Sequence, residues 1–381
     1  MQDIKRLEST YLRAKIEYYE GNEIMTDAAF DKIEAILKEA GSKVIEQVGA
    51  KRKDFDFEHP TRMLSLGKRQ TEQIDGVTNY MDAEFNEWYY KRIKDLQKNG
   101  FEVLENLIPL TASPKFDGNA INIIYTGKQL FQTLTRGDGK AGKNITKRFE
   151  KILGTELILD GLDVTEEDTI EIRCEVVIKK SIFDEKYAGD FANPRNYVAG
   201  VIGKDDYDEV KVSELTPIPL QFLLNGKFIG WKHFRKNDFC KKNWDVPFSA
   251  PDYLSVIKKF EGMREDNEFL LDGMVIALPI NTREILGQNS HDPNWAIAIK
   301  YICEEVTSEV VDIEWNIGKR GQFTPVVLLK PVQLAGTTVK RASGYNAGFI
   351  IDNKIKPGAI VSLRKSGDII PQILNVIYSP E

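Results

Sequence analysis

The sequence contains few cysteines and no long apolar run, and each shortage excludes a class of protein. Only three of its 381 residues are cysteines, and Cys174, Cys240 and Cys303 stand far apart. This argues against a disulfide framework and against a four-cysteine zinc module. Prolines break the two longest uncharged stretches, residues 215–226 and 369–380. Because a membrane-spanning helix needs about 20 apolar residues, no such helix is expected.

Histidine is also scarce. The sequence has three, His59, His233 and His291, which are isolated from one another along the chain. We therefore expect no histidine-based metal site. The N-terminal residues from Met1 are not followed by an apolar run, so they do not predict a signal peptide. Together with the low cysteine content, this predicts a cytoplasmic protein.

The length and composition are typical of a multidomain globular protein. Domains usually contain about 100–200 residues, so a chain of 381 residues predicts two or three of them. Hydrophobic residues make up 42% of the chain and charged residues 29%, which is enough for a sizeable core. The 58 Asp and Glu residues outnumber the 52 Lys and Arg residues, for a net charge of −6. As an average, that acidity counts against a nucleic-acid partner.

The pattern of apolar residues changes twice along the chain. The first 40 residues predict a helical hairpin that turns at Gly21-Asn22, followed by a polar linker over residues 43–60. A further helix is expected over residues 82–98, ending at Asn99-Gly100. From about residue 108, alternating segments predict strands interrupted by short helices. After about residue 304, short strands between Gly and Pro turns predict a small barrel, and an OB-fold fits them. We therefore expect an α+β protein with domains over residues 1–58, 59–304 and 305–381.

One short motif has the residue types of a nucleophilic site. Lys115 stands two residues before Asp117 and three before Gly118, just ahead of a predicted strand. A lysine amine becomes a nucleophile when burial or a neighbouring cation lowers its pKa. Asp117 could orient such an amine, and Gly118 allows backbone to approach a ligand. The same tetrapeptide is also a common surface turn, and on its own it favours the turn.

Five further motifs follow in order. Arg136 precedes the glycines of Arg-Gly-Asp-Gly and suits a phosphate or ribose contact. Glu175 stands between apolar neighbours in an alternating strand, where it could touch a ribose hydroxyl or a metal-bound water. Arg195 belongs to Phe-Ala-Asn-Pro-Arg-Asn, Asp272 precedes Gly-Met-Val-Ile, and Lys300 ends Trp-Ala-Ile-Ala-Ile-Lys. Each motif alone favours a turn, a loop or a solvated strand face, but the ordered set does not.

This ordered set resembles the NAD-dependent DNA ligases, a family of covalent nucleotidyltransferases, over nearly the whole chain. Lys-x-Asp-Gly alone also occurs in ATP-dependent ligases and mRNA-capping enzymes. The N-terminal hairpin, the segment Met63-Leu64-Ser65-Leu66 and the motifs around Arg195 and Lys300 make the resemblance specific. It implies three parts: a helical domain for the nicotinamide mononucleotide half of NAD, an ATP-grasp-like nucleotidyltransferase (adenylation) domain of antiparallel sheets with helices, and an OB-fold β-barrel that binds DNA.

The resemblance also implies the reaction. Lys115 would attack the α-phosphorus of NAD, release nicotinamide mononucleotide and become lysyl-AMP. AMP would then pass to a 5′-phosphate at a nick in duplex DNA, and a 3′-hydroxyl would displace it to seal the strand. Mg²⁺ or Mn²⁺ would neutralise the phosphate and orient the displacement. Such an enzyme serves DNA replication and repair.

Each site residue takes a role from the same resemblance. Asp117 would help set the state of the lysine, Arg136 and Glu175 would hold the ribose, and Lys300 would hold the α-phosphate. Asp272 and Glu175 would hold the metal or its waters. The remaining NAD-binding residues would be Ser65, Leu66, Ser113, Arg195 and Ala277, with Tyr18, Tyr19, Asp27, Phe30 and Asp31 for the nicotinamide half.

The sequence departs from the family pattern at two positions that are expected near the adenine. The family usually has a glutamate where this chain has Ser113 and a lysine where it has Ala277. Loss of only one would leave a buried polar partner unpaired, at a cost of about 1–3 kcal/mol. Loss of both predicts a repacked site that reads adenine through backbone and apolar contacts. In the N-terminal hairpin, the pair Tyr18-Tyr19 stands where the family commonly has a histidine beside the tyrosine, and Phe30 replaces the usual tyrosine.

The largest departure is in length. Full-length bacterial members continue with a zinc finger, a helix-hairpin-helix domain and a BRCT domain, whereas this chain ends at Glu381. We expect a minimal, zinc-free, monomeric enzyme with weaker affinity for nicks, of the kind that phages or other viruses favour. Two alternatives stay open: an RNA or hybrid-strand ligase, and a catalytically impaired nucleic-acid-binding relative.

The charge is unevenly distributed. Residues 315–381 contain nine basic and three acidic residues, a net charge of +6, so residues 1–314 carry −12. The acidic average therefore hides a basic C-terminal part that is expected to follow DNA phosphates. The resemblance places the DNA contacts at two basic pairs in turns of the barrel, Lys319-Arg320 and Arg364-Lys365.

Overall fold

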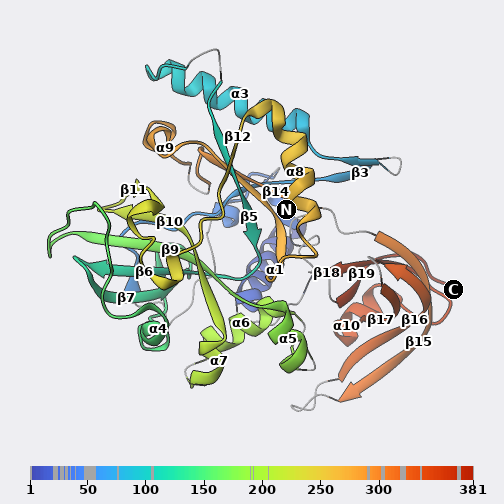
Figure 1. Cartoon of the computed structure of the whole chain (residues 1–381). Coiled ribbons are helices and arrows are strands. Elements are labelled where there is room, and N and C mark those ends of the chain that lie inside the picture. Colours follow the sequence, from blue (N-terminus) through green and yellow to red (C-terminus); the bar gives the residue numbers. More distant parts are fainter. Residues whose placement is uncertain are drawn as a thin grey trace. The chain divides into compact units, whose positions relative to one another are not determined.

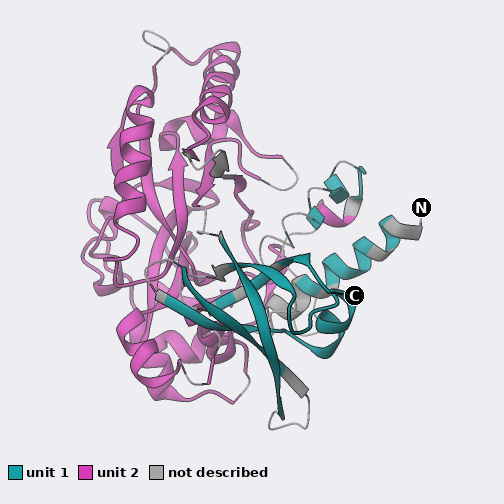
Figure 2. Cartoon of the chain, turned by 90° about the vertical axis from the view of Figure 1, so that its right-hand side faces the viewer, with its two compact units in different colours: residues 1–18, 22–42, 303–381 teal, residues 19–21, 43–302 magenta. Residues whose placement is uncertain are grey.

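The computed structural model divides the chain into two compact units, which Figure 2 colours separately. One contains Met1–Tyr18, Asn22–Ser42 and Cys303–Glu381, and the other contains Tyr19–Gly21 and Lys43–Ile302. In several elements only the backbone is described. The described residues are 2–19, 25, 30, 33–34, 36–38, 40–46, 57–74, 77–103, 107–188, 190–191, 193–204, 206–289, 292–301, 305–317, 323–334, 337–366 and 370–380.

Helices and antiparallel sheets are mixed throughout, as Figure 1 shows, which confirms the predicted α+β class. Within the described ranges, no helix is both long enough and apolar enough to cross a membrane. Short 3-10 turns occur at Lys43–Glu46, Trp231–His233, Asp238–Cys240 and Ala250–Asp252.

The N-terminal part of the first unit is helical. Helix α1 spans Gln2–Tyr19, and helical residues return between residues 30 and 38. The fully buried Tyr11 joins the two segments, because its ring stacks on Phe30 with the centroids 4.6 Å apart and its hydroxyl donates to Glu34 at 3.1 Å. One face of the Phe30 ring is therefore used inside the hairpin. The side chains of Tyr18 and Tyr19, and all of Asp27 and Asp31, lie outside the described residues.

Two five-stranded sheets form the body of the second unit. The first, in the order β11-β10-β9-β6-β7, is antiparallel throughout. Its strands are β6 (Asn119–Thr126), β7 (Gln129–Thr135), β9 (Thr169–Ile178), β10 (Leu215–Leu224) and β11 (Lys227–Ile229). The helices between its strands are α4 (Thr146–Leu153), α5 (Lys180–Lys186), α6 (Pro194–Gly203) and α7 (Glu209–Ser213).

The second sheet has the order β12-β5-β13-β14-β2, and only its β14–β2 pair is parallel. Its strands are β2 (Gly67–Gln70), β5 (Leu110–Phe116), β12 (Val246–Phe248), β13 (Leu271–Ala277) and β14 (Ala296–Lys300). One face of this sheet packs against helices, burying Phe85 of α3 and Phe260 of α8 in a single core with Met274 and Ile299. The helices are α3 (Asp82–Lys98), α8 (Tyr253–Gly262) and α9 (Ile280–Leu286).

Two short pairings complete this unit. Strand β1 (Phe57–Glu58) pairs with β8 (Ala141–Gly142), and β3 (Glu72–Ile74) forms a hairpin with β4 (Val77–Asn79). The first pairing matters for the site, because it ties the start of the 57–66 segment to the turn that follows Arg136.

Sequence periodicity predicted the longest helix and the main strands of this unit, but not α6, α8 or α9, and not the burial of its first sheet. The helix expected over residues 82–98 is α3, and the long alternating strand is β9. Alternation would leave one face of β9 solvated. Instead, Glu171 and Arg173 are buried, as is Asn122 on the neighbouring β6. The physical reason is that the segment after β1 covers that face, since Arg173 donates to the carbonyls of Thr61 and Arg62.

The C-terminal part of the first unit is a closed barrel with the strand order β15-β16-β17-β19-β18. The strands are β15 (Glu305–Ile317), β16 (Phe323–Leu334), β17 (Thr337–Ser343), β18 (Ile360–Ser366) and β19 (Ile370–Tyr378). A helix that periodicity did not predict, α10 (Ala347–Asp352), lies between β17 and β18, and the side chain of Asn346 caps its N-terminus by accepting from the Phe349 N–H.

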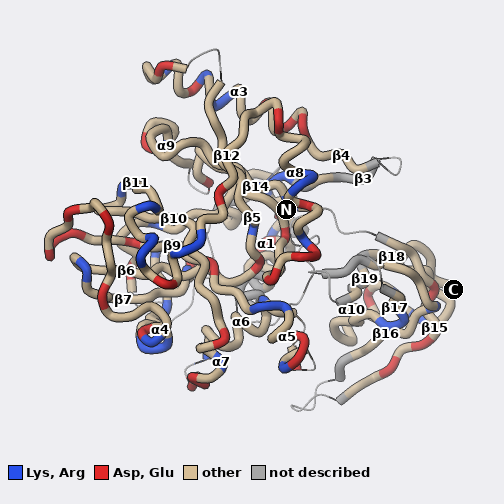
Figure 3. Tube along the Cα trace, in the orientation of Figure 1, with Lys and Arg blue, Asp and Glu red and all other residues tan. Residues whose placement is uncertain are grey.

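The barrel is less basic than the sequence analysis predicted, because counting from residue 315 leaves out most of β15. That strand carries Glu305, Glu309, Asp312 and Glu314, so the chain from residue 305 onward has nine basic and seven acidic residues, a net charge of +2. Figure 3 marks the charged residues along the trace. Lys330 pairs with Glu309 at 2.6 Å, and Arg341 pairs with Glu314. The positive charge therefore belongs to the segments after β15.

Candidate active site

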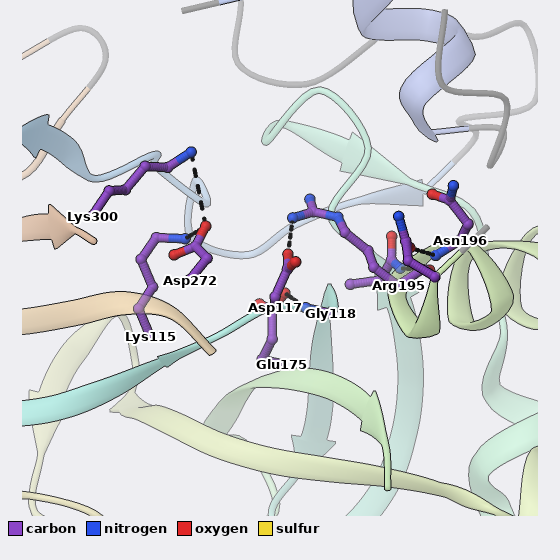
Figure 4. A network of polar contacts seen from close by, with 10 residues as sticks. Lys115, Asp117, Gly118, Glu175, Arg195, Asn196, Asp272 and Lys300 are labelled. Atoms are coloured by element: carbon purple, nitrogen blue, oxygen red, sulfur yellow. Dashed lines mark hydrogen bonds and ion pairs between the residues drawn. The ribbon is translucent and has the colours of Figure 1, made fainter. Parts of the chain in front are cut away.

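Three adjacent strands of the second sheet bring together the predicted nucleophile and two other predicted residues. The register pairs Gly273 of β13 with Lys115 of β5 on one side and with Lys300 of β14 on the other. A bulge at Asp272 turns its carboxylate to both amines: Oδ2 lies 2.8 Å from Lys115 Nζ and 3.8 Å from Lys300 Nζ. In Figure 4 both lysines point at this carboxylate.

The charges of this cluster affect one another strongly. Burial alone would raise the pKa of Asp272, but the attraction of Lys115 and Lys300 outweighs burial and holds that pKa below its usual range. The cluster therefore keeps a carboxylate between two amines. The three side chains remain partly exposed, by 20% for Lys115, 19% for Asp272 and 12% for Lys300. An entering anion could therefore replace the carboxylate as the partner of either amine.

Two glycines allow the strands to approach closely enough to form the site. A Cβ on Gly273 would lie 2.3 Å from the Ile299 carbonyl oxygen, and a Cβ on Gly118 would lie 2.1 Å from the Val176 carbonyl oxygen. Both distances are sterically forbidden. The glycine of each Asp-Gly pair is thus required by contact with a neighbouring strand: Gly273 positions Asp272 beside β14, and Gly118 positions Asp117 beside β9.

Asp117 lies in a second ion pair at the end of β5. Its carboxylate accepts a hydrogen bond from Arg195, which lies in the first turn of α6. The helix begins there because Asn193 caps it, accepting from the Asn196 N–H at 2.8 Å, and Pro194 occupies the first turn. The Asn119 side chain donates to the Arg195 carbonyl at 3.2 Å. The Asn193 cap therefore fixes the start of the helix, and the bonds to Asp117 and Asn119 fix the direction of Arg195.

Glu175 lies on β9, in the first sheet, and faces the same site. Its Oε1 accepts from the Gly118 N–H at 3.2 Å. Burial raises the pKa of Glu175 to about 7, against the opposing attraction of Arg195 and Lys115. Glu175 is thus suited to hydrogen-bond a ligand hydroxyl, and its ribose contact stays a prediction.

Arg136 and Ser65 meet although they lie far apart in the sequence. An Arg136 guanidinium nitrogen donates to Ser65 Oγ at 2.7 Å. Arg136 also acts electrostatically on Glu175, so both predicted ribose contacts lie in one region. Leu66, the neighbour of Ser65, packs against the large core of the second sheet.

The two positions that depart from the family pattern share a strand face with Lys115. The register pairs Ser113 with Val275 and Ala277 with Thr111. Because side chains alternate along a strand, Thr111, Ser113 and Lys115 point to the same side, as do their partners on β13. Ser113 and Ala277 are therefore neighbours on the face that leads to the nucleophile, and their joint loss of polar groups affects one place.

The carboxylates fit a divalent cation that is also bound by substrate. Asp272 Oδ1 is buried and has no hydrogen-bond partner among the described residues. Lys115 acts electrostatically on both Asp272 and Glu175. Mg²⁺ is usually held by one or two carboxylates together with substrate phosphates. In the described part of the chain, no three His, Cys, Asp or Glu residues form a group that could hold a metal alone.

Sequence reasoning missed a set of polar residues beside this site. His59, which is isolated in the sequence, lies with its Nε2 3.1 Å from the Arg136 carbonyl oxygen and its Nδ1 3.3 Å from Asn122 Nδ2. Asn122 in turn donates to Glu171 at 2.7 Å. The only available signal was polar residues in strands that are otherwise apolar, and that pattern equally describes a solvated strand face.

The predicted DNA contacts lie elsewhere in the chain. Arg364 and Lys365 belong to strand β18. In the strand register, Arg364 lies opposite Glu305 of β15 and Gln372 of β19, and the side chains of Arg364 and Lys365 are not described. Lys319 and Arg320 lie outside the described residues.

Family comparisons cover most of the chain. Residues 52–304 match the family model described as the NAD-dependent DNA ligase adenylation domain, and residues 307–381 match the NAD-dependent DNA ligase OB-fold domain. A DNA ligase of Clostridium perfringens (strain SM101 / Type A) is 32% identical over 393 residues, covering 95% of this chain and 56% of that protein. A DNA ligase of Staphylococcus saprophyticus is 30% identical over 420 residues, covering 99% and 56%.

The chain thus spans about half the length of the curated relatives that it matches. Among solved structures, the ATP-dependent DNA ligase from bacteriophage T7 is matched with a TM-score of 0.30 at 11% identity, covering 81% of this chain and 98% of that one. That likeness is too weak to carry an argument.

Proposed function

The chain belongs to the family of NAD-dependent DNA ligases, and we propose that it seals nicks in duplex DNA with NAD as the adenylate donor. The observation that carries the proposal is the cluster around Lys115, whose amine lies 2.8 Å from Asp272 in a half-buried position. Lys300, Arg195 and Arg136 add three cationic side chains to the same unit, as binding of an anionic dinucleotide requires.

The first step would form a phosphorus–nitrogen bond. Lys115 Nζ attacks the α-phosphorus of NAD, and the bond from that phosphorus to nicotinamide mononucleotide breaks, with the electron pair leaving on the departing phosphate. An ammonium has no lone pair, so Lys115 must release a proton to water before attack, and this also ends its ion pair with Asp272. The amine loses a further proton to water as the phosphorus–nitrogen bond forms. Lys300 then remains as a partner for Asp272, so that the carboxylate is not left alone.

The remaining side chains would hold the adenylate during the two later transfers. Arg136, Ser65 and Glu175 suit the ribose, and Arg195, held by Asp117, suits a phosphate. AMP passes to the 5′-phosphate of the nick, and attack by the 3′-hydroxyl on that phosphate releases AMP. When bound, Mg²⁺ would neutralise phosphate charge, held by Asp272 and Glu175 with substrate oxygens. Tyr18, Tyr19, Asp27, Phe30 and Asp31 stay the proposed contacts to the nicotinamide half.

Labelling of the protein by NAD tests the proposal. NAD labelled in its adenylate is expected to label the wild-type protein, and Lys115→Ala is expected to abolish the label because no nucleophile remains. Lys128→Ala removes an exposed lysine in the turn between β6 and β7, and this control variant should label normally. Label from ATP rather than NAD, or undiminished label on Lys115→Ala, would refute the assignment.

Nicks of different composition then test the strand preference. Sealing is expected on an all-DNA nick, whereas a preference for RNA-containing nicks would favour the RNA or hybrid-strand alternative. A protein that accepts label but seals neither substrate would be the catalytically impaired relative. Action as a cytoplasmic monomer, DNA contacts by Lys319, Arg320, Arg364 and Lys365, and domain limits at residues 58 and 304 stay predictions.

A further inference from the structure

Four buried polar side chains form a network in the sheet that carries Glu175. They are His59, Asn122, Glu171 and Arg173, with exposed fractions of 8%, 0%, 1% and 8%. Asn122 links His59 to Glu171, and Glu171 Oε2 lies 3.7 Å from an Arg173 guanidinium nitrogen. Arg173 in turn donates to the Thr61 carbonyl at 2.9 Å and to the Arg62 carbonyl at 3.2 Å.

The chemistry of the groups fixes the direction of each bond. A carbonyl oxygen only accepts, so His59 Nε2 must carry the proton that contacts the Arg136 carbonyl. The other ring nitrogen, Nδ1, then accepts from Asn122 Nδ2, and the second proton of that amide goes to Glu171. A turned Asn122 amide would place its oxygen against the Glu171 carboxylate, so the network permits one arrangement.

The network fastens the segment before Ser65 to the sheet that carries Glu175. Backbone bonds hold the 57–63 segment to the turn after Arg136. The His59 N–H donates to the Lys140 carbonyl and the Met63 N–H donates to the Gly139 carbonyl, each at 2.8 Å. Arg136 stands just before this turn, and Ser65 stands just after this segment. The backbone itself joins Arg136 to β6, because the Arg136 N–H donates to the Ala120 carbonyl at 3.1 Å. The network attaches the 57–63 segment to β6 and β9 through side chains, and Glu175 lies on β9 four residues after Glu171.

Stability alone does not account for these groups. In the described part of the chain, Asn122 Oδ1, Glu171 Oε1 and Arg173 Nε have no hydrogen-bond partner. A buried network that is only partly satisfied is less stable than an apolar core of the same shape. The feature that it does supply is a fixed position for the segment that leads to Ser65, the hydrogen-bond partner of the Arg136 guanidinium.

We propose that His59, Asn122, Glu171 and Arg173 are positioning residues that hold the 57–66 segment on β6 and β9. Ser65 then directs the Arg136 guanidinium toward an adenylate ribose beside Glu175. None of the four is expected to touch NAD. The inference rests on the proposed function, and it predicts that loss of the network weakens the hold on NAD in a protein that still folds.

The test compares two buried asparagines in the same unit. Asn122→Leu breaks the network, whereas Asn237→Leu removes an asparagine that is 7% exposed and bonds only to the backbone of Ile158 and Phe234. Both variants should melt at a lower temperature. In single-turnover labelling by NAD, Asn122→Leu should raise the KM for NAD by about 10- to 100-fold, and Asn237→Leu should leave the KM unchanged.

A pair of histidine variants provides rescue and covers the case in which Asn122→Leu does not fold. His59→Gln keeps an N–H at the Nε2 position for the Arg136 carbonyl and should restore most of the wild-type KM, whereas the shorter His59→Asn should not. The inference is overturned if folded Asn122→Leu or His59→Asn keeps the wild-type KM, or if Asn237→Leu raises the KM equally.

Calorimetric binding of NAD to the same proteins separates this inference from the proposed function. If the wild-type protein binds NAD but accepts no label, the proposed function fails, and the ratio of Kd between Asn122→Leu and Asn237→Leu still decides the role of the network. A wild-type protein that neither binds NAD nor accepts label overturns both.

Discussion

The candidate site has two halves, built on different sheets, that are stabilised by different interactions. The charged half, Lys115, Asp272 and Lys300, lies on β5, β13 and β14 and consists of ion pairs that remain partly exposed. The hydrogen-bonded half, Arg136, Ser65 and Glu175, adjoins the buried network on β6 and β9. Partly solvated ion pairs can exchange partners, whereas a buried hydrogen-bond network cannot. One half can therefore rearrange with the reacting phosphate while the other keeps the ribose in place.

Removal of the central carboxylate should break the charged half and produce the largest effect. In Asp272→Asn, Lys115 and Lys300 lose their common counter-charge, and the amine is no longer held where the α-phosphorus is expected. We expect the single-turnover rate of lysyl-AMP formation to fall by about 10²- to 10³-fold. Quench-flow labelling at saturating NAD measures this rate.

A matched control exists on the surface. Asp160 also faces two cations, Arg235 at 2.8 Å and Lys236 at 3.3 Å, but these cations are 60% and 54% exposed and Asp160 itself is 30% exposed. Because exposed ion pairs contribute about 0–1 kcal/mol, Asp160→Asn should change neither the rate nor the stability by much. An equal fall in rate in both variants would mean that the charged half has no special role.

A methyl group at either Asp-Gly glycine should disturb one half at a time. Gly273→Ala would place a Cβ against the Ile299 carbonyl in the charged half, and Gly118→Ala would do the same against Val176 beside Glu175. Each change should lower the free energy of unfolding by about 1–3 kcal/mol, the usual cost of overpacking. Urea unfolding measures this.

Gly262 at the end of α8 is the control, because no heavy atom lies within 4 Å of an added Cβ there. Gly262→Ala should leave the stability unchanged or raise it by up to about 1 kcal/mol, since alanine is the better helix former. A stable Gly273→Ala protein with a normal labelling rate would contradict the steric account of the charged half.

The hydrogen-bonded half should respond to acid, and this is the smallest expected effect. Burial lowers the pKa of His59 below 6.5, with Arg173 acting in the same direction and the Arg136 carbonyl, Glu171 and Asp138 opposing it. Since the folded protein binds the proton less well than the unfolded chain, the contribution of His59 to stability is complete above pH 6.5 and is lost as the pH falls through the lowered pKa.

Urea unfolding across about pH 5–8 checks this sign. The slope attributable to one histidine is at most about 1.4 kcal/mol per pH unit. His59→Gln should flatten the acid side of the curve, and wild-type and variant curves that run parallel would contradict the prediction.

The sequence was sufficient to predict the main strands, the helix α3 and the residues that the fold brings together in the charged half. Local patterns specify α3 and β9 because helix and strand periodicities depend on nearest neighbours along the chain. The order of motifs identified Lys115, Asp272 and Lys300, because a resemblance to a family depends on residue types and spacing. The same reasoning missed α10, whose helical signal is only six residues long. It also overestimated the positive charge of the barrel, because the count began at residue 315 and left out the acidic residues of β15.

Only the tertiary structure decided the hydrogen-bonded half. Glu171, Arg173 and Asn122 are polar residues at positions where alternation predicts a solvated face, and they are buried because a segment that precedes them by more than 50 residues folds over that face. His59 is isolated in the sequence, but in the fold its ring contacts the Arg136 carbonyl and the Asn122 side chain. The wide spacing of the three histidines predicted that they form no metal site. Spacing could not show what a single histidine contacts, because contacts between distant segments are determined by the packing of the whole chain.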